Sequence, residues 1–253
     1  MIKNEQKNNF RSEKMRIAVI SDIHSNVYAL DKVLVDIQKR NIDMIVCTGD
    51  LVGYATRPNE VIETLKKEKI LTIMGNYDEA IGNLKIICGC DYPDPKDAEK
   101  AGLSMHFTGQ ETTDENKEYL RNLPKEATFT FNDKKIKFVH GSTRLINEYL
   151  KENSKEADEV MSELVEDILV CGHTHIPYAK YYGEKLLVNA GSVGKPKTNN
   201  PNANYVIIDI ASLNVEVEII EVSYDFEKIA KEIEINEVLP SDFARLIREG
   251  SSR

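Results

Sequence analysis

An aspartate and a histidine placed two residues apart are the first residues of this sequence that could do chemistry. An apolar run at residues 17–20 predicts a buried strand, and Asp22 and His24 follow it. In an extended chain, residues two apart point to the same side, so a carboxylate oxygen and an imidazole nitrogen would face one point. Such a pair suits Mn, Fe, Zn or Ni better than Ca or Mg. Because an aspartate and a histidine at this place can also simply cap a helix, the pair alone does not establish a metal site.

The same design recurs along the chain, and four of the five histidines take part in it. Four more apolar runs end in polar groups that can bind metal, namely Gly49-Asp50, Gly75-Asn76, His140 and Gly172-His173-Thr174-His175. Three of these groups begin with a glycine, which permits a tight turn and a close approach of the backbone. Each group has an ordinary interpretation as a cap, a turn or a satisfied polar residue. A coincidence at five strand ends is far less probable, so the sequence predicts a metal site.

Alternating strand and helix patterns position the first groups. The run at 17–20 is followed by a helical pattern over residues 30–37, which Asn26 can cap, and then by the run that ends at Asp50. A second helix opens at Pro58 and leads to the run that ends at Asn76. This alternation predicts a parallel sheet, in which ligands collect beyond the carboxyl ends of the strands.

The region from about residue 85 to 110 has no clear period and contains several glycines and prolines. We interpret it as a lid-like insertion near the site, because a long loop inside a compact domain is usually functional. Thr112 with Glu115 resembles a capping box for a helix that ends near Leu123.

The second half of the chain predicts strand pairs rather than alternation. The candidate hairpins are 128–131 with 135–139, 179–182 with 186–188, and 205–210 with 215–222, and a helical stretch covers 156–165. Residues 226–233 and 243–247 predict two surface helices that close the chain. The fold class is therefore α/β, with two packed mixed β-sheets flanked by helices.

Length, charge and cysteine content narrow the class of protein. The 253 residues suit a single domain over 15–253, preceded by a polar extension at 1–14 that we expect to be disordered. No apolar run is long enough for a membrane span. A net charge of −9 opposes nonspecific binding to nucleic acid and favours a small phosphorylated substrate. Two of the four cysteines lie in predicted core strands, which suits reduced thiols and a cytoplasmic location.

Taken together, Asp22-Ile23-His24, Gly49-Asp50, Gly75-Asn76, His140 and Gly172-His173-Thr174-His175 resemble the ordered signature of the calcineurin-like metallophosphoesterases. The resemblance covers roughly residues 15–195 and is similar to the small bacterial and archaeal phosphodiesterase-like branch. It implies a four-layer α/β/β/α fold and two divalent transition-metal ions, Mn, Fe, Zn or Ni. The implied ligands are Asp22, His24, Asp50 and His175 for one ion, and Asp50, Asn76, His140 and His173 for the other.

The resemblance also implies an activity. A hydroxide that bridges the two metal ions would attack phosphorus, which makes the chain a hydrolase of phosphate esters, preferably a phosphodiesterase or nucleotide hydrolase. Two alternatives stay open: a phosphomonoesterase of the same fold, and a noncatalytic metal-binding scaffold. Some scaffolds of this fold have eroded ligand sets, whereas every ligand position is filled here. A homo-oligomer is compatible with the sequence.

One position departs from the family pattern. Family members often carry a histidine after the Gly-Asn pair, where it can protonate the leaving oxygen, but this chain has Tyr77. A phenol is a weaker proton donor at pH 7 than an imidazolium, so either Tyr77 acts weakly or His106, the only other histidine, supplies the proton. Arg144 and Arg57 are candidates to bind the substrate phosphate, although surface salt bridges are their ordinary alternative. Cys88 and Cys90 lack further metal-binding partners, so we expect inert thiols.

Overall fold

A computed structural model describes residues 14–85, 87–89, 94–212 and 214–251. The extension predicted at 1–14 lies outside the described residues except for Lys14, which begins the first strand. In the part of the chain that the structure describes, no helix is both long and apolar enough to cross a membrane.

The first sheet contains the strands that precede the first three predicted ligand groups. Its order is β10-β9-β1-β2-β3, with β1–β2 and β2–β3 parallel and the other pairs antiparallel. The strands are β1 (Lys14–Ile20), β2 (Met44–Cys47), β3 (Leu71–Thr72), β9 (Ala203–Ala211) and β10 (Val215–Val222). The parallel core of this sheet follows the alternation predicted from the sequence.

The second sheet contains the strands that precede the remaining histidines. Its order is β4-β5-β6-β8-β7, with β5, β6 and β8 parallel to one another. The strands are β4 (Glu126–Phe131), β5 (Lys134–Val139), β6 (Ile168–Cys171), β7 (Tyr178–Tyr182) and β8 (Lys185–Asn189). The predicted hairpins are confirmed as the antiparallel pairs β4–β5, β7–β8 and β9–β10.

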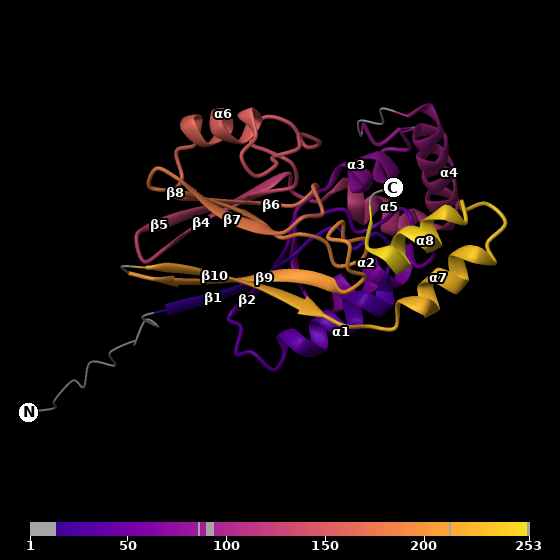
Figure 1. The fold of residues 1–253 in the computed structure, drawn as a ribbon, viewed down its shortest axis with the longest axis horizontal. Helices are drawn as coiled ribbons and strands as arrows, with labels where there is room; N and C mark the ends of the chain where they lie inside the picture. Colours follow the sequence, from indigo (N-terminus) through magenta and orange to yellow (C-terminus); the bar gives the residue numbers. More distant parts are fainter. Residues whose placement is uncertain (1–13, 86, 90–93, 213, 252–253) are drawn as a thin grey trace, which may run out of the picture.

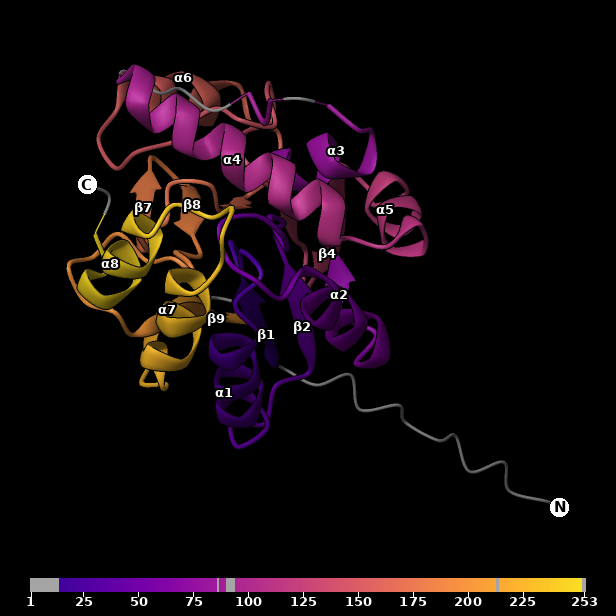
Figure 2. The same ribbon diagram turned by 90° about the vertical axis from the view of Figure 1, so that its right-hand side faces the viewer.

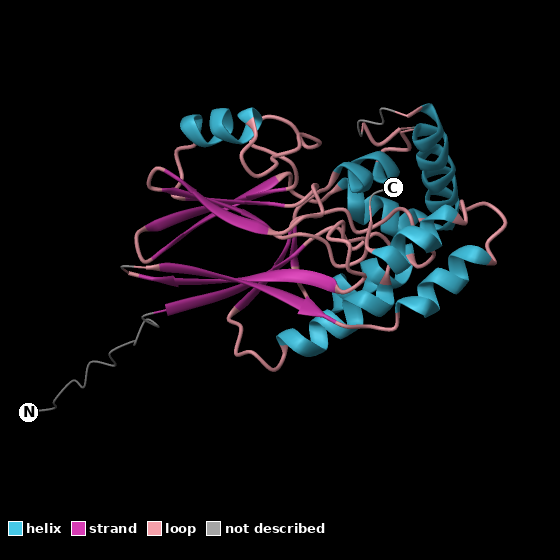
Figure 3. Ribbon diagram, viewed as in Figure 1, coloured by secondary structure: helices cyan, strands magenta, loops and turns pink. Residues whose placement is uncertain are grey.

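The two sheets stack face to face with helices outside, which confirms the predicted α/β fold of two packed mixed sheets (Figures 1 and 3). One apolar cluster fills the space between the sheets and includes Val19, Phe138 and Val170. A second cluster lies between the first sheet and its helices, and a smaller third one lies beneath α6 (Lys155–Glu163). Burial on both faces explains why the central strands are continuous apolar runs.

Short helices follow the first strands and begin beside the predicted ligands. Asn26 caps α1 (Val27–Ile37), as predicted, and its side chain accepts a hydrogen bond from the Ala29 N–H at 3.2 Å. Pro58 begins α2 (Pro58–Lys67), where its missing N–H costs nothing. Helix α3 (Asn76–Gly82) starts at a candidate ligand and was not predicted from the sequence.

The region between residues 85 and 110 is largely a helix, so the expectation of a long irregular loop was wrong, while its role as a lid-like insertion stays a prediction. Asp94 caps α4 (Pro95–Glu111), and the residues at 90–93 lie outside the described ones. Ala101, Ser104 and Thr108 contribute much of the buried face of α4. Sequence periodicity did not reveal this helix, because several positions of its buried face carry small or polar residues in place of large apolar ones.

The predicted cap of the following helix needs correction. Helix α5 (Asp114–Arg121) is capped by Thr113, whose side chain accepts from the Asn116 N–H at 3.3 Å, while Thr112 ends α4 instead. The two helices predicted at 226–233 and 243–247 are confirmed. Helices α7 (Phe226–Glu234) and α8 (Asp242–Glu249) bury apolar side chains such as Ile229 and Phe243 in the core of the first sheet, because both helices are strongly amphipathic.

Candidate metal centre

The structure brings the predicted ligands together in two neighbouring groups of buried side chains. Asp22, His24 and His175 form the first group, and Asp50, His140 and His173 form the second. Within each group, one ligand atom from every residue lies within 4.8 Å of the others. Residues that are 151 positions apart in the chain, Asp22 and His173, are joined by a hydrogen bond of 2.9 Å between the Asp22 Oδ2 and the His173 N–H.

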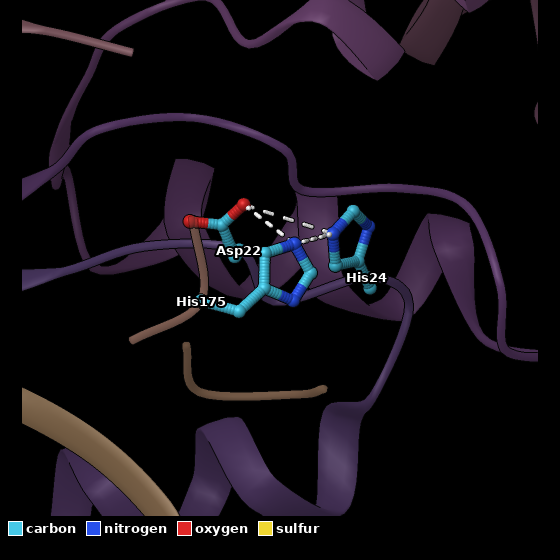
Figure 4. A group of neighbouring side chains, drawn as sticks. All are labelled: Asp22, His24 and His175. Carbon is cyan, nitrogen blue, oxygen red and sulfur yellow. Dashed lines mark hydrogen bonds and ion pairs between the residues drawn. The ribbon is translucent and has the colours of Figure 1, made fainter. Parts of the chain in front are cut away.

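In the first group, a backbone carbonyl binds the Nδ1 atom of each imidazole, which turns the Nε2 atom toward the other ligands. His24 Nδ1 donates to the Val52 carbonyl at 2.9 Å, and His175 Nδ1 donates to the Lys195 carbonyl at 2.6 Å. Each ring therefore presents Nε2, and the two Nε2 atoms are 3.2 Å apart (Figure 4). The Asp22 Oδ1 lies 3.2 Å from His175 Nε2 and 3.7 Å from His24 Nε2.

The second group is organised in the same way around His140. His140 Nδ1 donates to the Thr48 carbonyl at 2.8 Å, so Nε2 points toward the other ligands. This Nε2 lies 3.0 Å from Asn76 Oδ1, 3.2 Å from His173 Nδ1 and 3.4 Å from Asp50 Oδ2. Asn76 thus joins the group, with its amide nitrogen donating to the Cys88 carbonyl at 3.1 Å.

Asp50 links the two groups. Its Oδ2 lies 3.4 Å from His140 Nε2 in the second group and 3.8 Å from His24 Nε2 in the first. Its Oδ1 accepts a hydrogen bond from the Tyr77 N–H at 2.8 Å, which fixes the carboxylate between them.

The backbone around the ligands is unusual. Five of the candidate ligands adopt positive φ angles between 48° and 65°, namely Asp22, His24, Asp50, His173 and His175. Such angles are uncommon for residues with side chains and gather at functional sites. Gly75 approaches its neighbours closely, since a Cβ there would lie 2.2 Å from the Asp50 Oδ1. A larger residue at this position would push the shared carboxylate away.

The donor atoms of the first group fit a cation. Because each Nδ1 donates to a carbonyl, a neutral His24 or His175 presents only a lone pair at Nε2. Two such lone pairs meet the Asp22 Oδ1, which is buried and has no hydrogen-bond partner. Three electron-pair donors facing one point repel one another unless a positive charge lies between them. The nitrogen and oxygen donors match divalent transition metals.

Burial sets the protonation of the histidines. It lowers the pKa of His24, and it lowers the pKa of His173 and of His175 to about 3, so these imidazoles are neutral as metal binding requires. Burial also acts to lower the pKa of His140, but the adjacent Asp50 carboxylate outweighs it and raises this pKa to about 9. A divalent ion would take the place of that proton beside Asp50.

Residues from neighbouring loops support the ligands. The Ser192 hydroxyl donates to the Asp22 carbonyl at 2.7 Å, and the Asn189 amide donates to the Gly172 carbonyl at 2.7 Å. These bonds fix two ligand loops against each other.

Aromatic side chains surround the centre, and sequence reasoning missed two of them. The Tyr54 ring lies edge-on to His24 with a centroid distance of 4.8 Å, and the Tyr149 ring lies against His173 at 4.1 Å. The buried Lys195 places its Nζ 4.6 Å from the centre of the Tyr54 ring. No motif distinguishes Tyr54 and Tyr149 from the other tyrosines among the 11 of the chain.

The structure places the two candidate proton donors differently. Tyr77 is buried, and its ring lies 5.4 Å from the His24 ring and 5.0 Å from the Tyr54 ring. His106 is exposed on α4 and lines a cavity of about 320 Å³ between α3 and α4. None of the seven candidate ligands lines that cavity, and the role of His106 as the proton donor stays a prediction.

The two candidate arginines are engaged by carboxylates. Arg57 donates from Nε and Nη2 to Glu232 at 2.8 and 2.7 Å, and from Nη1 to Glu60 at 3.1 Å. Arg144 forms ion pairs with Glu148 and, at 3.1 Å, with Glu159. These contacts match the ordinary alternative of surface salt bridges.

Cys47 and Cys171 are buried free thiols, and burial raises the pKa of both, that of Cys171 to about 12. The expectation that Cys88 and Cys90 are inert thiols stays a prediction. Cys90 lies outside the described residues.

The chain is similar to a known family of phosphoesterases and to several of its relatives. The family model described as the calcineurin-like phosphoesterase superfamily domain matches residues 15–213. An uncharacterized protein of Methanocaldococcus jannaschii, MJ0912, is 34% identical over 237 residues, which cover 87% of this chain and 92% of that protein. The phosphodiesterase YfcE of Escherichia coli K12 is 26% identical over 211 residues, or 79% of this chain and 91% of YfcE.

Solved structures share the fold. The metallophosphoesterase of Sphaerobacter thermophilus has a TM-score of 0.75 at 26% identity and covers 94% of this chain and 99% of its own. The hypothetical protein PH1004 of Pyrococcus horikoshii has a TM-score of 0.80 at 23% identity, with 94% and 100% covered.

Proposed function

The chain belongs to the calcineurin-like phosphoesterase superfamily, and we propose that it is a dinuclear-metal-dependent hydrolase that prefers phosphodiesters or nucleotides. One observation carries this proposal: two adjoining groups of buried ligands share the carboxylate of Asp50. A shared carboxylate between two nitrogen-rich groups is the arrangement that a pair of divalent ions needs.

We assign the ligands accordingly. Asp22, His24 and His175 would hold one ion, while Asn76, His140 and His173 would hold the other, with Asp50 between them. The metals we propose are Mn, Fe, Zn or Ni, because imidazole nitrogens make up about half of each set. When bound, such ions supply Lewis acidity and an activated water at neutral pH.

The residues of the chain contribute orientation and charge. The carbonyls of Thr48, Val52 and Lys195 hold three imidazoles so that each presents Nε2 to the centre. Asp22 and Asp50 offset the charge of the ions, and the neutral Asn76 adds an oxygen donor without adding charge. No Ser, Cys or His nucleophile is required by this scheme.

A small phosphorylated substrate is favoured over a polymer. The net charge of −9 opposes nonspecific association with nucleic acid. The relative YfcE is a phosphodiesterase, which supports a diester preference here. We place the protein in the cytoplasm because Cys47 and Cys171, in two core strands, are free thiols. We also propose one domain over residues 15–253, since α7 and α8 share a core with α1 and α2.

Two alternatives remain as outcomes of experiment. A phosphomonoesterase would differ only in what surrounds the ions. A noncatalytic scaffold is disfavoured because every ligand position is filled and the donors converge.

The deciding experiment measures metal content and hydrolysis together. Protein purified without chelator should contain about two transition-metal ions per chain by elemental analysis, and removal of the ions should abolish hydrolysis of bis(p-nitrophenyl) phosphate. Added Mn²⁺ should restore it. Metal-free protein that hydrolyses the diester normally in chelator would refute the proposal. Metal-loaded protein without activity on any phosphate ester would favour the scaffold.

A further inference from the structure

The C-terminal segment forms a hairpin of two helices beyond the residues that the family model matches. We call residues 224–250, which contain α7 and α8, the C-terminal hairpin. The family model ends at residue 213, yet the hairpin packs beside α1 and extends toward α4 (Figure 2). Its contacts reach the loops that carry the metal-ligand candidates.

Helix α7 binds the loop that follows Asp50. The Glu232 carboxylate accepts hydrogen bonds from the Thr56 hydroxyl at 2.5 Å and from the Arg57 Nε and Nη2 at 2.8 and 2.7 Å. It also accepts from the Tyr28 hydroxyl of α1 at 2.6 Å. Bidentate pairing with Arg57 fixes the direction as well as the distance of this contact.

Helix α8 reaches the same loop through aromatic rings. The buried Phe243 ring lies 5.1 Å from the Tyr54 ring in an edge-on arrangement, and Tyr54 lies edge-on to the candidate ligand His24 at 4.8 Å. The neighbouring Asp242 pairs with Lys100 of α4 at 2.5 Å. Edge-on pairs of this kind stabilise a defined ring orientation.

The two ends of the hairpin contact further ligand loops. Before α7, the Tyr224 hydroxyl accepts a hydrogen bond from the Asn26 side chain at 3.0 Å, two residues after His24. After α8, the Gly250 carbonyl accepts from the Asn199 N–H at 2.8 Å, in the segment that follows Lys195.

Backbone hydrogen bonds connect these contacts to the ligands. The Arg57 N–H donates to the Ser25 carbonyl at 3.2 Å, and the Ser25 N–H donates to the Leu51 carbonyl at 2.8 Å. The His24 N–H in turn donates to the Asp50 carbonyl at 3.0 Å. A displacement of the Arg57 backbone would therefore displace Ser25 and, through the hydrogen bonds to Asp50 and Leu51, the adjacent His24.

The other half of the centre is held by different parts of the chain. Asn76 is oriented by the Cys88 carbonyl, and His140 by the Thr48 carbonyl. The hairpin contacts are thus concentrated on the half that contains Asp22, His24 and His175.

We propose that the C-terminal hairpin is a positioning element for the His24 half of the metal centre, acting through Glu232 on Arg57 and through Phe243 on Tyr54. It sets the affinity of this half for a divalent cation by fixing the loop after β1, which carries His24, against the loop after β2, which carries Asp50. The inference depends on the proposed function in one respect, namely that this half binds a metal ion.

The experiment compares matched substitutions in the full chain. Glu232→Gln removes the charge that binds Arg57, while Glu234→Gln makes the same change two residues away, where the partner is Arg248. Phe243→Leu removes the ring that contacts Tyr54, while Leu246→Val alters another buried side chain of α8. Metal-free protein is titrated with Mn²⁺ by calorimetry, and amide hydrogen exchange is measured on the same metal-free protein.

In Glu232→Gln and Phe243→Leu, one of the two Mn²⁺ binding events should weaken about 10-fold, as is typical when a partner of a ligand is lost, and the other should stay within about twofold. The amides of Ser25 and Arg57 should exchange faster in metal-free protein. Both control variants should match wild type in both measurements.

Equal effects of Glu232→Gln and Glu234→Gln, an equal weakening of both binding events, or unchanged exchange at Ser25 and Arg57 would each overturn the inference. Wild type that binds no Mn²⁺ would refute the proposed function, and with it the affinity role of the hairpin. Wild type that binds two ions while the variants change neither event would refute only the inference. If Phe243→Leu fails to fold, Glu232→Gln decides the result, because its side chain lies at the edge of the core.

Discussion

The carboxylate of Asp78 accepts a hydrogen bond from the backbone N–H of Asp50 at 2.8 Å, so one buried acid holds the backbone of another. The same carboxylate accepts from the N–H groups of Leu51 at 2.9 Å and Gly75 at 2.9 Å. Burial and the nearby Asp50 raise the pKa of Asp78 to about 7. Asp78 therefore joins the ends of β2 and β3 beneath the centre, a role that no sequence motif revealed.

Replacing Asp78 with asparagine should destabilise the fold and loosen Asp50. The amide has one acceptor oxygen for three N–H donors, and unsatisfied buried donors cost about 1–3 kcal/mol. Urea unfolding of the metal-free protein should show a loss of this size. A variant as stable as wild type, with unchanged metal content, would show that Asp78 does not organise the loop.

Asp50→Asn should remove both metal binding and hydrolysis while the fold is retained. The substitution takes away the charge shared by the two groups but keeps the size of the side chain. Elemental analysis and circular dichroism measure the two parts of this expectation. The exposed Asp31→Asn serves as the control and should retain two ions. Full activity in Asp50→Asn would contradict the assignment of Asp50 as the shared ligand.

The substrate preference should reflect the missing histidine at position 77. With Tyr77 there, leaving-group protonation should be poor, so aryl diesters or nucleoside polyphosphates should react faster than alkyl monoesters. Tyr77→His should raise the alkyl rate relative to the aryl rate, and Tyr77→Phe should lower it or leave it unchanged. Steady-state kinetics with Mn²⁺ measure these ratios.

His106→Ala should leave the ratio of alkyl to aryl rates unchanged, because His106 lines the cavity between α3 and α4. A selective loss of alkyl hydrolysis in His106→Ala would instead identify His106 as the proton donor. Rapid alkyl monoester hydrolysis by wild type, insensitive to both positions, would defeat the leaving-group explanation.

Arg144→Ala should change KM by less than about twofold. The guanidinium is already paired with Glu148 and Glu159 on an exposed part of the surface, where such pairs contribute little. Steady-state kinetics on an aryl diester test this expectation. A tenfold rise in KM at constant kcat would restore Arg144 as a substrate-binding residue.

Acid should remove the stabilisation that Glu232 provides. Burial acts to raise the pKa of this carboxyl, but hydrogen bonds from Arg57, Thr56 and Tyr28 outweigh it and lower the pKa from 4.5 to about 2. A carboxyl whose pKa is lowered by folding stabilises the fold above its unfolded pKa and loses this effect as the pH falls. The difference in free energy of unfolding between wild type and Glu232→Gln should thus be full above about pH 5.

That difference should be on the order of 1–3 kcal/mol at pH 7, allowing for solvent screening of a partly exposed pair, and should shrink between about pH 4.5 and 2. Urea unfolding at several pH values measures it. A difference that grows toward acid pH would contradict the assigned contacts.

Sequence patterns predicted the sandwich well because its central strands are buried on both faces. Runs such as Ile168–Cys171 are apolar throughout. In the second half of the chain, pairs of predicted strands flank short turns, which is the pattern of β-hairpins. Helix α4 escaped prediction because Ala101, Ser104 and Thr108 hide its buried face among small and polar residues. Helices α7 and α8 were predicted, but their contacts were not, because an amphipathic pattern shows that one face of a helix is buried and does not show which residues bury it.

The sequence by itself determined which residue types stand at the strand ends, and thereby the chemistry of the ligands. An aspartate or histidine directly after an apolar strand is a local feature, and strand parallelism brings such ends to one edge. Only the tertiary structure decided that Glu232 and Phe243 support the loop after Asp50, that Tyr149 lies against His173, and that Arg144 is paired on the surface. The contacts of Glu232, Phe243 and Tyr149 join segments that are far apart in the chain, and no local pattern encodes their pairing, because it depends on how helices and loops pack onto the sheets.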